Sequence, residues 1–360
     1  MSDELKSLAE GTAKGAAEGI MAGIKNWFSR GNGGNKKIRT QDPTAGLDVD
    51  FNAIEVVRIL NKAVCVNQAH LIQYIVLAGA LHKKLKDRMR EEPEDLSGLT
   101  NRLGALYDFL NRNLGLAAQR NFRFLHDYYL ARSPKPPWPR ICLKLPDENQ
   151  PGRANMLADV FRDSDVGYNS IYPVEENTGH VEVMRDGQFF LCSDIPSLAK
   201  EGRYKNPRLD PHRVEEYGPQ NEEELSESID KYGYARDLAW ERCWRPSGGG
   251  DGPARVDAPL ESCYKSTLII PMTLKSHDKD LSGDFKEIMG LEDKSRNIFG
   301  YLCFDHLAGG YFNNDPDVAV GYVVADILSL YYMTQLNYTK RSTTYQRSIE
   351  LCGDPLETET

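Results

Sequence analysis

The stretch S-T-L-I-I-P-M-T-L at Ser266–Leu274, followed by F-G-Y-L-C-F-D at residues 299–305, decides the fold. Both stretches are rich in the β-branched, aromatic and other apolar residues that strands favour. In the first stretch, the side chains that would point to either face of the strand are apolar, which indicates a central strand covered on both faces. Because proline cannot donate to a strand ladder, Pro271 predicts a strand end or a bulge within this run. We expect the two strands to lie side by side in one sheet.

Weaker patterns surround these two strands. Residues 318–332 predict a long closing helix, whose apolar positions recur at helical spacing. Further elements are expected upstream: a strand at 141–145, a short helix at 155–161, a strand at 170–174, and a hairpin of 179–184 and 189–192 that turns on Asp186-Gly187. The charged segment 275–297 predicts a loop with one helical turn.

The N-terminal half has a helical period instead. An apolar face runs from Phe51 to Leu85 and ends before Pro93, and a second helix is expected from Leu96 to Leu130. Residues 51–132 therefore predict a long helical hairpin or stalk. Its seam is compatible with a coiled coil that forms a homodimer, and equally with a plain intramolecular hairpin.

The first thirty residues form a separate unit. Glycines at 11, 15, 19 and 23 make a G-x-x-x-G stripe on an amphipathic helix, with Trp27 and Phe28 near its end. Residues 4–28 could dock on a protein partner or a membrane surface, or self-associate. The alternative is a loosely structured leader, since each interior glycine costs about 0.5–1 kcal/mol relative to alanine. Residues 31–50 predict a flexible linker, and 348–360 an acidic tail.

The C-terminal region, from about residue 138 to 345, resembles the GAF domain family. The resemblance rests on the order and spacing of three elements, together with L-C-S-D-I-P at residues 191–196. These elements are a strand with Ser266, Leu268 and Pro271, a strand with Gly300, Leu302 and Asp305, and then Phe312, Asp315 and a closing helix containing Ala325 and Leu328. Two departures are the long segment 199–260 and the enlarged loop 275–297. The complete motif of cyclic-nucleotide-binding members and a cysteine in a clear chromophore-attachment context are absent, so the resemblance does not imply the identity of a ligand or cofactor.

The resemblance implies an α+β fold, with a GAF-like antiparallel sheet covered by helices over residues 138–347. The hairpin and the Gly-striped helix would precede it. It also implies a non-catalytic sensory or regulatory protein, which binds a small ligand or a protein partner and signals through its helical stalk. Two alternatives remain at this point: a membrane-acting effector that uses the Gly-striped helix, and an enzyme with an unrecognised site.

A ligand site is expected between the sheet and the variable segment 194–245. This segment offers aromatic walls and a few polar groups, the usual makeup of a pocket. The candidate residues are Asp194, Arg203, Tyr204, Tyr234, Trp240 and Trp244. The alternative is that the aromatic residues simply pack this segment onto the core.

Composition limits the partners and the chemistry. The formal net charge of −9 argues against broad nucleic-acid binding, which needs a Lys/Arg surface. The cysteines number seven and form no C-x-x-C pair, which favours a reducing cytosol over disulfides or zinc. No run approaches the length of apolar residues needed to span a bilayer, and the longest candidate, residues 71–81, contains Gln73, so we expect a cytoplasmic protein with peripheral membrane association at most. Walker, H-E-x-x-H, G-x-S-x-G and EF-hand motifs are absent, and His180, His212 and His306 are expected to be structural. A Cys/His pair that acts as nucleophile and base remains an alternative, because residues far apart in the sequence can become neighbours when the chain folds.

Overall fold

The computed structural model describes most of the chain from residue 53 onward. The described ranges are 53–92, 95–133, 136–146, 156–162, 171–217, 238–244, 263–274, 282–289 and 297–353. The Gly-striped segment 1–30, the linker 31–50, the candidate site residue Tyr234 and the last residues of the predicted tail, 354–360, lie outside them.

The helical hairpin predicted for residues 51–132 is present. It consists of α2 (Ala53–Glu91) and α3 (Leu96–Arg132). Asp95 caps α3 by accepting a hydrogen bond from the Gly98 N–H at 3.0 Å, and it also binds Arg88 of α2 at 2.5 Å. One aspartate thus starts the second helix and fixes the turn from the first.

The sheet has six strands, and every neighbouring pair is antiparallel. The strands lie in the order β3-β2-β1-β6-β5-β4. Their bounds are β1 Arg140–Pro146, β2 Met156–Arg162, β3 Ile171–Pro173, β4 Phe190–Cys192, β5 Ser266–Leu274 and β6 Asn297–His306. Together with the helices, this sheet confirms the α+β class.

The two deciding strands lie side by side, as expected. Ser266 is opposite His306, and the register runs along β5 to Leu274 opposite Asn297. Pro271 does not end β5, but the register shifts immediately after it, between Met272 and Thr273. The irregularity predicted by the proline is therefore a local bulge.

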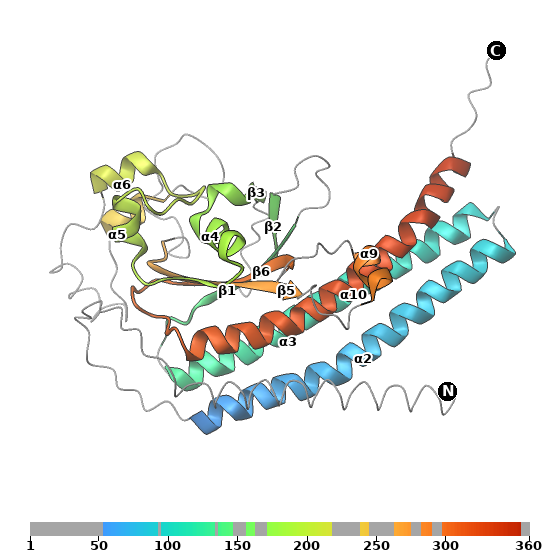
Figure 1. Cartoon of the computed structure of the whole chain (residues 1–360), viewed down its shortest axis with the longest axis horizontal. Helices are drawn as coiled ribbons and strands as arrows, with labels where there is room; N and C mark the ends of the chain where they lie inside the picture. The colour runs from blue at the N-terminus through green and yellow to red at the C-terminus, as the bar shows by residue number, and fades with distance from the viewer. Residues whose placement is uncertain are drawn as a thin grey trace, which may run out of the picture.

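Long helices cover one face of the sheet (Figure 1). Helix α10 (Pro316–Gly353) contacts β5 and β6, and α3 lies beside it; α2 packs against α3 and α10 on the side away from the sheet. The closing helix is longer than the expected 318–332. A single apolar core joins these helices to the inward side chains of the central strands, among them Leu106, Leu125, Tyr331, Leu328, Leu143, Ile270, Leu302 and Phe304.

The shorter helices α4, α5 and α6 lie on the other side of the sheet, whereas α9 lies against α10 (Figure 1). Helix α4 contacts β4 and β5, and α9 lies in the segment 275–297 and contacts α10. The bounds are η1 Val174–Glu176, α4 Thr178–Asp186, α5 Ile195–Lys200, α6 Pro211–Tyr217, α8 Leu238–Arg242 and α9 Gly283–Met289. A second apolar cluster gathers α5, α6 and α8 around the residues that precede β5.

The prediction of a short helix at residues 155–161 is wrong. This segment is β2, which pairs with β1 on one side and with β3 on the other. Two neighbouring strands supply its backbone hydrogen bonds, and such pairing overrides a weak local preference for helix.

The prediction of a hairpin at 179–192 is correct for its second strand and wrong for its first. Residues 190–192 form β4, but 178–186 form α4. Asn177 caps α4 by accepting from the Gly179 N–H at 3.0 Å, and Gly187 ends it with φ 63°, its N–H bonded to the Val183 carbonyl. The Asp186-Gly187 pair is therefore a helix end rather than a hairpin turn, since glycine serves both roles.

Two of the described helices are long and apolar enough to cross a membrane by length and composition. They cover residues 55–91 in α2 and 316–347 in α10, and most of the second is buried in the core. The expectation from purely apolar runs missed them, because uncharged Asn, Gln and His residues extend the apolar run of α2. Buried helices of soluble proteins have the same composition, so this property alone does not show whether either helix lies in a membrane.

Candidate functional site

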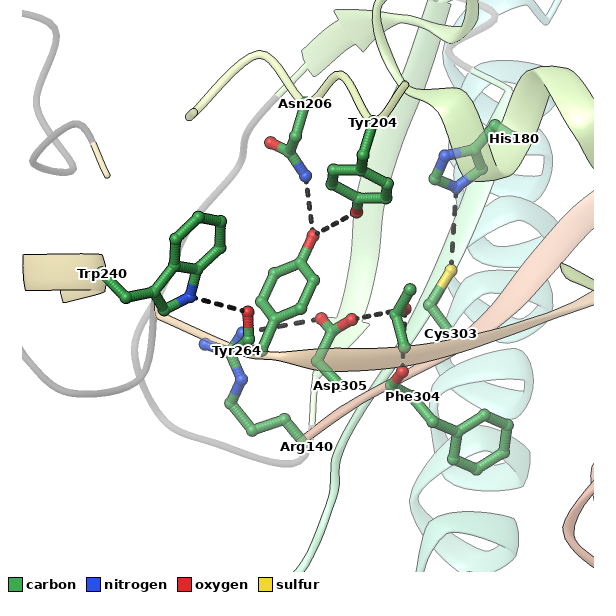
Figure 2. Close-up of polar contacts among 10 residues, drawn as sticks. Arg140, His180, Tyr204, Asn206, Trp240, Tyr264, Cys303, Phe304 and Asp305 are labelled. Atoms are coloured by element: carbon green, nitrogen blue, oxygen red, sulfur yellow. Dashed lines mark hydrogen bonds and ion pairs between the residues drawn. The ribbon is translucent and has the colours of Figure 1, made fainter. Parts of the chain in front are cut away.

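The candidate site lies on the face of the sheet opposite the long helices (Figure 2). Strand alternation puts Leu302 and Phe304 into the core with the long helices, and Tyr301 and Cys303 on the other face. Asp305 continues this second face at the end of β6. It is directly opposite Arg140, the first residue of β1.

Asp305 is bound loosely to its neighbours. Its carboxylate accepts a hydrogen bond from the Thr267 hydroxyl at 2.8 Å and lies 3.5 Å from the Arg140 guanidinium. The Arg140 and Asp305 side chains are 25% and 19% exposed, so both charged groups reach solvent. Charge-assisted hydrogen bonds are usually about 2.7–2.9 Å long, so this pair is not closed.

Two tyrosines extend the site. The Tyr264 hydroxyl accepts from the Asn206 amide at 2.7 Å and lies 3.1 Å from the Tyr204 hydroxyl. The Arg140 guanidinium is 5.7 Å from the centre of the Tyr264 ring, within cation–π range. Burial raises the pKa of Tyr264 and of Tyr204 above the ordinary value, so both phenols stay neutral and act through their O–H groups.

The structure brings three of the expected site residues together. Tyr204, Trp240 and Trp244 are buried in the second apolar cluster, and the Trp240 ring N–H donates to the Tyr264 carbonyl at 3.3 Å. Tyr204 alone of the three joins the polar network. Trp240 lies beside Tyr264 (Figure 2), and the ring centre of Trp244 lies 4.8 Å from that of Tyr264, so both tryptophans pack around this tyrosine.

Asp194 and Arg203 lie elsewhere. Asp194 caps α5 and accepts from the N–H and the hydroxyl of Ser197 at 3.1 and 2.5 Å. Arg203 is exposed and pairs with Glu201 at 2.8 Å. Both therefore have structural partners within their own segment.

Sequence reasoning did not select Arg140, Thr267, Asn206 and Tyr264, and it named Asp305 only among the residues that carry the resemblance to GAF domains. The one available signal was that Arg140 and Asp305 stand at the ends of predicted strands. The strand order was needed to show that these ends meet, because residues 140 and 305 are separated by most of the domain.

A Cys–His contact exists on the same face, but its environment does not favour nucleophilic chemistry. The Cys303 sulfur lies 3.7 Å from Nε2 of His180, and both residues are buried. Burial raises the pKa of the Cys303 thiol well above its ordinary value, with a further contribution from the neighbouring Cys142. A nucleophilic cysteine needs a lowered pKa and access to solvent. No group of three His, Cys, Asp or Glu residues in the described ranges is arranged to hold a metal ion.

A tight polar junction lies just across the sheet from Asp305. Asp317, at the start of α10, binds Arg132 at the end of α3 at 2.6 Å and accepts from the Tyr128 hydroxyl at 2.8 Å. His306 faces this junction: its Nδ1 accepts from the Ala308 N–H at 3.0 Å, so Nε2 carries the proton and donates to the Pro137 carbonyl at 2.9 Å. Hydrogen bonds thus join the end of α3 to the start of α10, and the end of β6 to the segment between α3 and β1.

Comparison with known proteins gives little to add. No protein-family model matches the chain, and no curated protein matches it. Among solved structures, the free methionine-R-sulfoxide reductase from Neisseria meningitidis, in complex with its substrate, is similar over 64% of this chain and 90% of its own length. The identity is 12% and the TM-score 0.28, values at which fold and function have to be argued from the residues of this chain.

Proposed function

We propose that the protein is a non-catalytic sensory protein, in which a small polar ligand binds at Arg140 and Asp305 and the long helices transmit the event. One observation carries this proposal. Arg140 begins the strand that follows α3, which ends at Arg132, and Asp305 is the last residue but one of the strand that precedes α10, which begins at Pro316. The resemblance to GAF domains supports the same kind of function.

The chemistry of the site favours a ligand with groups of both charge signs. A guanidinium pairs with carboxylate or phosphate oxygens, and a carboxylate accepts hydrogen bonds from amines or hydroxyls. Arg140 and Asp305 are partly exposed and 3.5 Å apart, whereas the buried pair Arg132–Asp317 is closed at 2.6 Å. A ligand that binds between Arg140 and Asp305 would replace a weak contact with two stronger ones.

Position on the strand couples this site to the helices. Asp305 faces the ligand side, and the next residue, His306, faces the helix side and binds the Pro137 carbonyl. A shift at the end of β6 would therefore act on the segment between α3 and β1 as well as on the approach to α10. Signalling requires that the ligand bind two arrangements of this junction with different affinities.

The test compares two aspartate variants. The full-length protein, purified from its own cells, would be examined by native mass spectrometry for a retained small molecule, and by thermal-shift screening with zwitterionic metabolites. We expect Asp305→Asn to lose the retained or stabilising compound, because its carboxylate is the acceptor. Asp210→Asn is the matched control, since Asp210 pairs with Arg213 at 3.7 Å and is also partly exposed, but lies away from the site.

Each outcome is decisive. Loss of the compound in Asp305→Asn with retention in Asp210→Asn supports the site. Equal binding by both variants, or no compound in either assay, contradicts it. Turnover of the compound by the wild-type protein would contradict the non-catalytic part of the proposal.

A further inference from the structure

Helix α2 is held to the rest of the molecule along one face only. Its buried residues include Ile59, Asn67, Tyr74 and Leu85, which pack towards α3 and α10. Among the described elements it forms the outermost layer on its side of the molecule (Figure 1). Its opposite face is therefore turned outward along the whole helix.

The middle of this outward face is uncharged and mostly apolar, with the exposed polar residues His70 and Gln73 among the apolar ones. Residues 63–82 contain no Asp, Glu, Lys or Arg, a segment about 30 Å long as a helix. Ile75, Val76 and Leu77 are 43%, 51% and 42% exposed, and Ala69 and Ala80 are exposed beside them. A surface helix normally carries polar residues on its outer face, so this exposure calls for a partner.

Basic side chains stand at both ends of the apolar segment. Arg58 and Lys62 precede it, and the exposed residues Lys83, Lys84, Lys86 and Arg90 follow it. Residues 53–92 contain seven Lys or Arg against four Asp or Glu, a net charge of +3 in a chain of net charge −9. Positive charge thus flanks the apolar segment of α2 at both ends, although α3 carries the same net charge of +3 without such an arrangement around an uncharged stretch of this length.

The charges decide between two occupants. In a pair of α2 helices from two copies of the chain, parallel packing would place each basic cluster against itself, and antiparallel packing would place Lys83 near Lys62. In the antiparallel pair Asp87 would approach Arg58 and Glu55 would approach Arg90, but this relieves only part of the repulsion. Glu55 and Glu92 already pair with Arg58 and Arg88 of their own helix. The two ends that would meet, residues 53–62 and 83–92, carry net charges of +1 and +2. An anionic lipid surface attracts both basic ends at once and accepts the apolar middle.

We propose that the outward face of α2 docks on the surface of an anionic membrane, with the helix lying in the plane of the interface. Ile75, Val76 and Leu77 enter the boundary between headgroups and acyl chains. The basic side chains extend to the lipid phosphates at either end. Because α2 contacts α3 and α10 rather than the sheet, the Arg140–Asp305 site stays open on the far side of the molecule.

Vesicle co-sedimentation of the full-length protein tests this proposal. The probes are vesicles of phosphatidylcholine alone and of phosphatidylcholine mixed with phosphatidylglycerol. The wild-type protein is expected to bind only the mixed vesicles. The double variant Lys83→Glu/Lys84→Glu should bind at least about fivefold more weakly per lysine replaced, and Val76→Glu should also lose binding, because a charge would enter the apolar boundary.

Met184→Glu is the matched control. Met184 is 49% exposed, close to the value for Val76, but it belongs to α4 on the other side of the sheet. This variant should bind mixed vesicles as the wild type does. Circular dichroism would show that all variants keep their helices, as expected for exposed positions.

Three results would overturn the proposal. The first is no binding of the wild-type protein to mixed vesicles. The second is binding that the α2 variants leave unchanged, which would assign the membrane contact to another segment. The third is a dimer, measured by light scattering, that Val76→Glu dissociates, which would identify a second copy of the chain as the partner of α2.

Discussion

His306 is a neutral imidazole fixed between two backbone groups. A second proton would have to sit on Nδ1, which already accepts the Ala308 N–H. Burial lowers the pKa of His306 to about 4, and the nearby Arg132 acts in the same direction. The ring is also stacked on Tyr311, at 3.5 Å between centres. Burial and Arg132 therefore outweigh the hydrogen bonds to the backbone of Pro137 and Ala308, which act in the opposite direction, and the imidazole stays neutral.

A pH dependence of stability follows for His306. Its pKa is 6.5 in the unfolded chain and about 4 in the folded one, so between these values the unfolded state binds more protons. Its contribution is present above about pH 6.5 and is lost as the pH falls towards 4, by about 3 kcal/mol at most. Urea unfolding at about pH 7 and about pH 5 should show this loss in the wild type, and a smaller loss in His306→Gln.

Other groups titrate in the same range, so the difference between variants is the measurement. His212→Gln serves as control, because His212 is an exposed histidine on α6. It should keep the wild-type pH dependence. If His306→Gln lost as much stability on acidification as the wild type, the neutral, buried state of His306 would be refuted.

The contact between α10 and the sheet depends on a glycine. A Cβ atom added at Gly321 would lie 2.8 Å from Cγ1 of Ile270, a buried residue in the middle of β5. Real Cβ atoms do not approach so closely, and Ile270 is branched at Cβ and cannot turn away freely. Helix and strand are therefore as close here as the backbone allows.

Two glycine-to-alanine variants separate this contact from helix propensity. Gly104, in the interior of α3, has open space around it, so Gly104→Ala should stabilise the protein by about 0.5–1 kcal/mol. Gly321→Ala gains the same propensity but overpacks the core, and should destabilise by about 1–3 kcal/mol. Urea midpoints measure both. Equal stabilisation by the two variants would mean that α10 does not press on Ile270.

The buried ion pair between Arg132 and Asp317 joins the end of α3 to the start of α10. The Asp317 side chain is fully buried, and burial raises the pKa of its carboxyl despite the opposing effect of Arg132. Asp317→Asn would leave a nearly buried guanidinium without its partner, at a cost of about 3–5 kcal/mol. Urea unfolding at neutral pH measures the loss. Glu182→Gln removes an exposed partner of Arg185 and should leave the midpoint unchanged. A mild effect of Asp317→Asn would show that the helix ends are held by other contacts.

The elements predicted best from the sequence were those whose own residues show a long and regular apolar pattern. The hairpin of α2 and α3 and the pairing of β5 with β6 followed from long apolar periods. The prediction for residues 155–161 was wrong because a strand seven residues long depends on pairing with adjacent strands, which a local sequence pattern does not reveal. The prediction of a strand at residues 179–184 was also wrong. Asp186-Gly187 is compatible with both a hairpin turn and a helix end, and the prediction did not take account of Asn177 as a helix cap.

The candidate site was less predictable than the fold. Aromatic residues in the segment 194–245 marked the correct side of the sheet, and Tyr204 belongs to the network. The charged pair itself comes from two strands that adjoin only because β1 pairs with β6. Such a site is a property of strand order, which composition and spacing do not encode.

At the scale of the whole molecule, one apolar core serves three layers. It continues from the inward faces of β1, β5 and β6 through α3 and α10 to α2. At the outer boundary, Tyr74 of α2 stacks on Tyr331 of α10, with ring centres 5.6 Å apart, and the amides of Asn67 and Asn121 exchange hydrogen bonds at 3.0 Å. Helix α2 is therefore part of the folded unit, although it does not contact the sheet extensively.

Removal of α2 should consequently destabilise everything that remains. A chain starting at residue 95 would expose the apolar side chains of Phe109 and Tyr331 and leave the Asn121 amide to water in place of Asn67. We expect this chain to unfold at lower urea concentration or to aggregate, as measured by circular dichroism and light scattering. A chain starting at residue 53 is the control, because it keeps every contact of α2 described above. If both chains unfolded at the same midpoint, α2 would be a detachable helix, and its membrane contact would be independent of the fold that holds the Arg140–Asp305 site.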